Sequence, residues 1–144
     1  LEDLKNIFEI NFFSQVLLTQ GISRYMSRFK SGSIINIAST AGMIGDVGTT
    51  SYGSSKAALI LATKVLSTEL GAKNIRVNAI SPSITQTDMF NQMDEKTRNK
   101  IITASALKRP ATAVEVANVA LFLASDLSSF ITGQVLRVDA GLKT

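Results

Sequence analysis

The sequence has 144 residues, 45% hydrophobic and 18% charged, with a net charge of +4; this composition supports a folded core and excludes an intrinsically disordered chain. His and Cys are both absent, which excludes a Ser-His-Asp triad, a Cys nucleophile, a zinc finger, an iron–sulfur cluster and a disulfide, and we expect no metal site. The scattered basic residues and the lack of Trp argue against nucleic-acid binding, and the longest apolar run, residues 57–62, is far shorter than the roughly 20 residues of a membrane span.

The first third of the chain predicts a long helix followed by a strand. Apolar residues recur at helical spacing from Leu4 to Phe29, on more than one face, so we expect this helix to be buried on more than one side. Residues 30–32 (Lys-Ser-Gly) end the helix. Residues 33–39 (SIINIAS) form a short β-branched run that predicts a strand buried on both faces. A loop with three glycines follows: Gly42, Gly45 and Gly48.

The middle of the chain predicts a second helix and a second strand. Residues 51–70 contain the almost continuous apolar stretch AALILATKVL, which predicts a helix packed against a sheet on one side and a partner on the other. We expect Gly71 to end this helix in the left-handed conformation. Residues 75–80 (IRVNAI) predict a strand that stops before Ser81 and Pro82.

The last third predicts two helices and a closing strand. A weaker helix is expected over residues 95–103. Thr112 and Glu115 have the spacing of a capping box, in which each side chain can bind the free backbone N–H of the other residue. This box opens a helix that runs to about Ala124, and residues 134–138 predict the final strand.

The order of these elements places a functional site at one edge of an α/β sheet. Strand 33–39, helix 51–70 and strand 75–80 form a βαβ unit, so the two strands run parallel with a right-handed crossover. Ligands of such sheets bind beyond the carboxyl ends of the strands. Ser39 and residues 81–83 lie at these ends, and helix 51–70 begins at the same edge.

Tyr52 and Lys56 are the candidate catalytic residues at this edge. They lie four residues apart in the first turns of one helix and therefore share a face. A free phenol loses its proton only near pH 10, but a lysine ammonium held close to it favours the phenolate and so permits proton transfer at neutral pH. Ser39 supplies a hydroxyl that can bind the same carbonyl oxygen. Together these groups would polarise and protonate a ketone while a hydride arrives from elsewhere.

Simpler explanations exist for the same residues. The pattern Tyr-x-x-x-Lys also arises by chance, and Ser39 could bind backbone, as most strand-end serines do. Asn11 lies within a predicted helix, where Asn usually faces solvent, but its apolar neighbours favour burial and hence a hydrogen-bond partner. The glycine loop lacks G-x-G-x-x-G, so we interpret it as the rim of a site and not as a phosphate cradle. Three apolar side chains are more typical of a core than of a substrate lid: Met89, Phe90 and Met93.

Six motifs follow one another along the chain: N-x-F at Asn11, I-I-N-I-A-S ending at Ser39, Y-G-S-S-K from Tyr52 to Lys56, I-R-V-N-A-I-S-P over 75–82, T-D-M over 87–89, and L-A-S-D with I-T-G-Q over 123–134. With these motifs the whole chain resembles the C-terminal part of a short-chain dehydrogenase/reductase. It is most similar to the 3-oxoacyl-[acyl-carrier-protein] reductase branch of that family. The spacings of Asn11, Ser39 and Tyr52 agree with the catalytic tetrad of the family.

The resemblance implies a fold, an activity and a set of roles. The chain would be the C-terminal half of a doubly wound, Rossmann-like parallel sheet with helices on both faces, in an oxidoreductase that uses NADP or NAD. Tyr52 would be the acid/base and Ser39 would hold the substrate carbonyl. Lys56 would activate Tyr52 and bind the ribose hydroxyls of the cofactor. Asn11 would hold a water that continues the proton relay from Lys56.

The resemblance also implies a nicotinamide site after the second strand. The loop after Pro82 would bind the carboxamide, with backbone groups from Thr85 and a hydroxyl from Thr87. Ser83 stands where the family usually has Gly and could crowd the nicotinamide. Ala140 also replaces a family Gly, in the closing D-G-G pattern.

Substrate, missing residues and location are further implications. Lys30 and Lys73 match positions where carrier-protein reductases have basic residues that meet the acidic carrier, which favours acyl thioesters among the carbonyl and alcohol substrates. The chain begins with Leu1 and within helical sequence, so we expect residues 1–144 to be one catalytic segment, without the upstream nucleotide-binding half of about a hundred residues. The absence of Cys fits a reducing compartment, and we expect a cytoplasmic protein.

Two other functions stay open. The first is a catalytically idle family member that acts as a binding or assembly module, suggested by Ser83 and the missing nucleotide loop. The second is an epimerase or dehydratase of the extended family, which the C-terminal motifs disfavour. We also expect a homodimer or homotetramer, because helices 4–29 and 51–70 are too apolar to face water. If the segment exists alone, strand 33–39 has an unpaired edge that favours aggregation.

Overall fold

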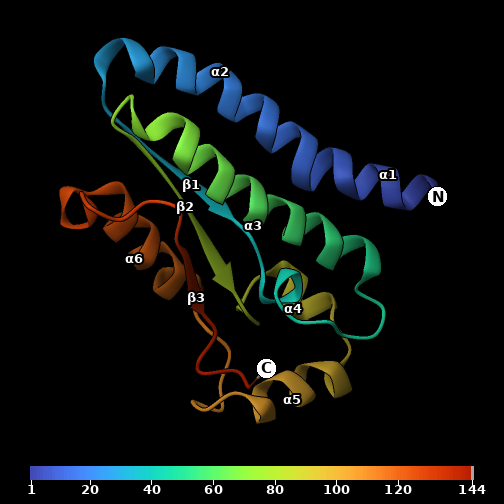
Figure 1. Cartoon of the computed structure of the whole chain (residues 1–144). Helices are drawn as coiled ribbons and strands as arrows, with labels where there is room; N and C mark the ends of the chain where they lie inside the picture. Colours follow the sequence, from blue (N-terminus) through green and yellow to red (C-terminus); the bar gives the residue numbers. More distant parts are fainter. Residues whose placement is uncertain (144) are drawn as a thin grey trace.

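The computed structural model describes residues 1–143 and has a sheet of three strands between two layers of helices (Figure 1). The elements in chain order are α1 (Glu2–Phe8), the π-helical turn η1 (Glu9–Phe13), α2 (Ser14–Phe29), β1 (Gly32–Ile37), the 3-10 turn η2 (Thr40–Gly42), α3 (Thr50–Gly71), β2 (Ile75–Pro82), α4 (Asp88–Gln92), α5 (Glu95–Ala104), α6 (Ala113–Ala124), the 3-10 turn η3 (Asp126–Ser128) and β3 (Val135–Val138).

The strands are parallel and are ordered β1-β2-β3. Gly32 pairs with Ile75 at the start of β1, and Ala79 pairs with Val135 at the start of the β2–β3 ladder. The predicted βαβ unit and parallel α/β fold are therefore confirmed. Among residues 1–143, β1 pairs with β2 alone, so its other edge is open, as expected for this segment taken by itself.

Helices cover both faces of this sheet. On one face, α2 and α3 lie side by side, and on the other face lies α6 (Figure 1). The core on the α2–α3 face contains Ile34, Ile75 and Val77, with Met26, Leu66 and Leu70 packed against them. On the α6 face, the Ser33 hydroxyl and the Arg76 guanidinium both donate to the carbonyl of Leu123, at 2.8 and 2.9 Å. These bonds tie the end of α6 to the sheet.

Several predicted boundaries differ from the structure. Strand β2 does not stop at Ile80 but continues through Ser81 and Pro82, because β3 pairs with both residues. The expected helix over 4–29 is interrupted by η1, and the short helix α4 was not predicted. The remaining predicted helices and strands agree with the structure within a few residues, and the Thr112–Glu115 capping box is present.

The prediction for Gly71 was wrong. Gly71 is the last residue of α3, and the left-handed residue is Asn74, at φ 55°. The chain continues for one more turn, with Asn74 N–H donating to the Gly71 carbonyl, before it enters β2. Asn tolerates this conformation better than most residues. The Asn74 side chain also donates to the Lys30 carbonyl at 3.0 Å, so the two turns that precede β1 and β2 are joined.

Some large apolar side chains of β1 and α3 are exposed, whereas small and polar ones of α3 are buried. Ile37 of β1 is 48% exposed, so the expected burial of both faces is wrong at the end of this strand. In α3 the buried stripe consists mainly of small and polar residues, whereas Leu61 and Val65 are exposed. Further large apolar side chains are exposed along the neighbouring helix: Leu17, Leu18, Ile22, Tyr25 and Phe29. Within residues 1–143, no helix has both the length and the apolar character to cross a membrane.

Candidate active site

The carboxyl edge of the sheet is formed by the turns that follow β1 and β2. Ser39 comes two residues after β1, and Ser83 follows the last residue of β2. Helix α3 begins at Thr50 on the same side, and α4 and α5 lie beyond this edge (Figure 1). The structure therefore brings Ser39, Ser83 and the start of α3 to one edge of the sheet, from three different segments of the chain.

Two glycines allow the turn that carries Ser39 to pack directly on α3. A Cβ atom at Gly42 would lie 2.8 Å from the backbone of Lys56 and Ala57, and one at Gly53 would lie 2.6 Å from the Ala41 carbonyl oxygen. Both distances are shorter than side-chain contacts allow, so this packing requires glycine at both positions. It places η2 against the part of α3 that carries Tyr52 and Lys56.

Ser39 is the N-cap of η2. Its backbone is extended, at φ −162° and ψ 152°, and its hydroxyl oxygen accepts a hydrogen bond from Ala41 N–H at 3.2 Å. The simpler interpretation, in which Ser39 binds backbone, therefore describes part of its role. A hydroxyl has one donor and two acceptor positions, and this cap uses one acceptor. The hydroxyl hydrogen can still donate to a substrate oxygen.

Lys56 and Tyr52 lie on the same side of α3, as their spacing predicts. The Lys56 Nζ atom is 5.9 Å from the centroid of the Tyr52 ring. It also donates to the Ile37 carbonyl oxygen at 2.9 Å, which fixes the amine between α3 and the end of β1. Burial lowers the pKa of Lys56 below its ordinary value.

Asn11 lies in η1 and is half-buried, so the prediction that it needs a partner is confirmed. Its Nδ2 donates to Ser55 Oγ at 3.1 Å, and Ser55 Oγ donates to the Tyr52 carbonyl at 2.7 Å. Ser55 is fully buried. Turns of π-helix are rare and occur frequently at functional sites. The contact links the first helical segment to the Tyr52 turn of α3.

Ser55 was not among the predicted site residues. It lies three residues after Tyr52 and directly before Lys56, within the motif Y-G-S-S-K. Its position in that motif was the available signal, but a Ser inside a helix does not by itself indicate which segment it binds. The partner, Asn11, is 44 residues away in the chain.

Apart from Tyr52 and Lys56, the residues expected to bind cofactor lie at the end of β2 and in the loop that follows it. Ser83 N–H donates to the Val138 carbonyl at 3.1 Å, and the Thr85 hydroxyl donates to the Ser83 carbonyl at 3.0 Å. The Thr87 hydroxyl donates to the Thr85 carbonyl at 3.3 Å. Pro82 and Ser83 are half-buried and Thr87 is exposed. Within residues 1–143, these hydroxyls bind their own loop and make no hydrogen bond to Tyr52 or Lys56.

Ala140 follows β3 in a strained conformation. Its φ is 56°, in the left-handed region that disfavours residues with a Cβ atom, and Gly141 follows at φ 68°. The Ala140 carbonyl accepts from Ala106 N–H at 2.8 Å. The predicted departure from Gly therefore falls where glycine would be conformationally preferred.

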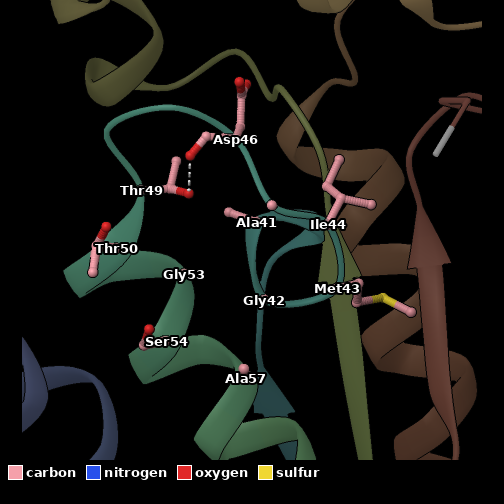
Figure 2. Close-up of a pocket in the computed structure, with 11 residues that line it drawn as sticks. Ala41, Gly42, Met43, Ile44, Asp46, Thr49, Thr50, Gly53, Ser54 and Ala57 are labelled. Carbon is pink, nitrogen blue, oxygen red and sulfur yellow. Dashed lines mark hydrogen bonds between the residues drawn. The ribbon is translucent and has the colours of Figure 1, made fainter.

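A hollow of about 380 Å³ lies beside the Ser39 turn (Figure 2). It is lined by residues 41–46 and by Thr49, Thr50, Gly53, Ser54 and Ala57. None of the four predicted catalytic residues lines it. Gly42 and Gly45 line this hollow but Gly48 does not, so the loop borders a hollow on a neighbouring face of α3, and its role as the rim of the active site stays a prediction.

Met43 connects the Ser39 turn to β2. The buried Ser81 hydroxyl donates to Met43 Sδ at 3.3 Å. In Figure 2 the Met43 side chain points away from α3, toward the strands. This contact joins the turn after β1 to the end of β2, and no pattern in the sequence predicts it.

Comparison with known proteins shows what this arrangement is similar to. Residues 1–143 match the family model described as enoyl-(acyl carrier protein) reductase. The 3-oxoacyl-[acyl-carrier-protein] reductase FabG of Thermotoga maritima is 41% identical over 141 residues, which make up 98% of this chain and 57% of that protein. The chain therefore spans little more than half the length of the curated relatives that it matches.

Solved structures with bound cofactors have the same fold over almost the whole chain. A 7α-hydroxysteroid dehydrogenase complexed with NADH and 7-oxo glycochenodeoxycholic acid superposes with a TM-score of 0.94 at 34% identity, over 97% of this chain and 55% of that one. ElxO with NADP bound superposes with a TM-score of 0.90 at 28% identity, over 98% of this chain and 58% of that one. The fold is therefore the Rossmann-like fold of these enzymes.

Proposed function

Because the chain belongs to the short-chain dehydrogenase/reductase family, we propose that it is the catalytic half of an NAD- or NADP-dependent oxidoreductase. The reaction is reduction of a ketone or 3-oxoacyl group, or oxidation of the corresponding alcohol. The observation that supports this most directly is the placement of Lys56 Nζ 5.9 Å from the Tyr52 ring, beside the turn that carries Ser39.

Tyr52 acts as the acid/base in this proposal. Its phenol donates a proton to the carbonyl oxygen during reduction and takes it back during oxidation. Lys56 carries the positive charge that favours the phenolate. Ser39 donates its free hydroxyl hydrogen to the same oxygen, so the developing negative charge meets two donors in place of water.

Asn11 and Ser55 position this machinery. The chain from Asn11 Nδ2 to Ser55 Oγ to the Tyr52 carbonyl fixes the first turn of α3 relative to η1. Asn11 would also hold a water that passes protons on from Lys56, as the family resemblance implies. An ammonium has three N–H donors. Lys56 can therefore keep its bond to the Ile37 carbonyl while it binds a second acceptor, or it can give up that bond.

The donor set at this edge fits a nicotinamide nucleotide. The Lys56 ammonium suits ribose hydroxyls, and the loop from Pro82 to Thr87 offers backbone groups and two threonine hydroxyls to a carboxamide. When bound, the nicotinamide supplies or accepts the hydride. Ser83 carries a side chain where the family usually has Gly, and its position is fixed because its N–H donates to the Val138 carbonyl. We expect it to affect cofactor affinity.

The adenosine part of the cofactor requires residues outside this chain. Two observations support an upstream nucleotide-binding half: the open edge of β1, and the match to little more than half of each relative. A strand from that half would complete the sheet at β1. We place the assembled enzyme in the cytoplasm.

An acyl carrier protein is the proposed source of the substrate. Lys30 and Lys73 are both exposed, and the bond between Asn74 and the Lys30 carbonyl holds their turns together. They lie at the amino ends of the strands, and Lys73 is about 30 Å along α3 from Tyr52, at about 1.5 Å per residue. Because of this distance, a carrier protein bound at these lysines would deliver its acyl group to the Tyr52 site of a second copy of the chain.

The second copy is proposed to pack on α1, α2 and α3. An apolar groove of about 410 Å³ lies between η1, α2 and α3, lined mainly by Phe12, Val16, Ala58, Leu61, Ala62 and Val65. The chain from α1 to the end of α2 carries Glu2, Asp3 and Glu9 beside Lys5 toward its amino end, and Arg24, Arg28 and Lys30 at its carboxyl end. A two-fold axis pairs opposite charges when the helices pack antiparallel. The same arrangement brings the lysines of one copy toward Tyr52 of the other.

The experiment that tests the function is Tyr52→Phe in the protein that carries this chain. We expect ketone reduction to fall by about 10²–10⁴-fold, as for loss of a general acid, with unchanged nicotinamide binding. Tyr25→Phe is the matched control, because Tyr25 is the other tyrosine and is exposed against Phe29. Near wild-type turnover in Tyr52→Phe would contradict the assignment. Absence of nicotinamide binding and turnover in the unmodified protein would favour an idle binding module.

A further inference from the structure

Helices α4 and α5 cover the region beyond the carboxyl edge without being part of the core. No residue of either helix is buried. Inside the segment, the Arg98 guanidinium lies 5.1 Å from the centroid of the Phe90 ring, which keeps the two helices together. Phe90, Ile101 and Ile102 are only half-buried, so polar contacts also contribute to the position of the segment.

Backbone hydrogen bonds fix the segment only at its base. Gln86 N–H donates to the Ala111 carbonyl at 2.9 Å, and Ala106 N–H donates to the Ala140 carbonyl at 2.8 Å. These bonds hold the two ends of residues 87–105 close to each other. Within the described residues, no backbone hydrogen bond joins residues 88–103 to a residue outside this segment.

One ion pair joins the part of the segment far from its base to the loop before α3. Lys100 Nζ lies 3.0 Å from Asp46 Oδ1, across 54 residues of sequence. Among residues 1–143, no other ion pair joins α4 or α5 to the rest of the chain. Both side chains are partly exposed, so the pair is weak and can break and re-form.

Local hydrogen bonds hold Asp46 in its loop. Its Oδ1 accepts from Val47 N–H at 2.9 Å, and its carbonyl accepts from the N–H and the hydroxyl of Thr49, at 3.2 and 2.8 Å. Figure 2 shows the bond to the Thr49 hydroxyl at the rim of the hollow. Asp46 thus belongs to the short loop between the Ser39 turn and α3.

We propose that Asp46 and Lys100 are positioning residues that hold α4–α5 closed over the substrate entrance. The expected effect of this ion pair on substrate binding rests on the proposed function. The loop with Asp46 continues into Ser39 on one side and into Tyr52 on the other, and the α4–α5 segment follows the loop of Thr85 and Thr87. The ion pair therefore connects the substrate side of the site to the cofactor side. When it breaks, the segment opens and bound substrate is released faster.

A double-mutant cycle tests this proposal. The variants are Asp46→Asn, Lys100→Gln and the double variant; Asn retains an acceptor for Val47 N–H. Lys96→Gln is the control, because Lys96 is exposed on the same helix and has no ion pair within the described residues. Hydrogen exchange of residues 88–104 and the KM for a ketone are measured at low and high salt.

We expect each single variant to raise both the exchange rate of α4–α5 and the KM by about two- to five-fold, the range for an exposed pair. The double variant should show no further increase, the kcat should not fall, and high salt should abolish the differences. Lys96→Gln should resemble the unmodified protein. Additive effects, or a Lys100→Gln variant indistinguishable from Lys96→Gln, would overturn the proposal. Normal exchange results without ketone turnover would instead contradict the proposed function.

Discussion

Gly42 shows how one missing side chain determines the geometry of the candidate site. The Ser39 turn contacts α3 because no Cβ atom stands between Gly42 and the backbone of Lys56. We predict that Gly42→Ala displaces the turn and lowers stability by about 1–3 kcal/mol. Turnover should decrease more than nicotinamide binding, because Ser39 moves while Lys56 stays in α3.

Gly45→Ala provides the control for this experiment. It lies in the same loop, and a Cβ atom there would have no neighbour within 4 Å. Thermal unfolding and kcat/KM should be close to those of the unmodified protein. Equal losses in the two variants would show that loop flexibility, and not the approach of the turn to α3, explains the effect of Gly42.

Individual site residues were predictable when one helix turn brings them together. The spacing of Tyr52 and Lys56 predicts a shared face, and the structure has that arrangement. Contacts between distant segments were not predictable in this way. The bonds from Asn11 to Ser55, from Ser81 to Met43 and from Lys100 to Asp46 each depend on tertiary packing, which one sequence does not encode as a local pattern.

The capping box at the start of α6 makes the stability of the protein depend on pH. The Glu115 carboxylate accepts two bonds from Arg109 and one from Thr112 N–H. The Arg109 guanidinium, followed by Thr112 N–H, lowers the pKa of Glu115 from 4.5 to about 2. Because the folded state holds this proton less tightly than the unfolded chain, the stabilisation is present above about pH 4.5 and is lost as the pH falls toward 2.

We predict that Glu115→Gln lowers the stability at neutral pH and flattens its decline between about pH 4.5 and 2. Glu95→Gln is the control, since Glu95 also lies in the first turn of a helix but has no ion pair among residues 1–143. Urea unfolding followed by circular dichroism across this pH range measures the difference. Parallel curves for Glu115→Gln and the unmodified protein would contradict the prediction.

Elements were predicted well where the local signal is physical and strong. The Thr112–Glu115 box and the apolar run of β1 have this character. The end of α3 was predicted wrongly, because glycine adopts both the helical and the left-handed conformation. Gly71 is helical, and the left-handed residue is Asn74. The length of β2 depended on β3, which pairs with Ser81 and Pro82, so it could not be read from β2 alone.

The whole molecule has an exposed apolar face where a monomer would normally be polar. We predict that the double variant Leu17→Glu, Leu61→Glu converts a dimer into a monomer, because it places four carboxylates in the two-fold interface. Leu107→Glu is a matched control, since all three leucines are 63% exposed and Leu107 lies outside the face. Sedimentation velocity gives the outcome, with circular dichroism as a check of folding. A monomeric unmodified protein would refute the proposed packing.

The open edge of β1 has a chemical consequence for Lys56. Ala38 N–H bonds to the Ile80 carbonyl, so by strand alternation the Ile37 carbonyl faces outward from the sheet, and its acceptor is already taken by the lysine amine. Any strand that docks there must compete with that amine or share the oxygen with it. If a docking strand takes this oxygen from the amine, the proposed release of Lys56 toward a nucleotide sugar becomes linked to completion of the sheet, and assembly of the domain would prepare its own chemistry.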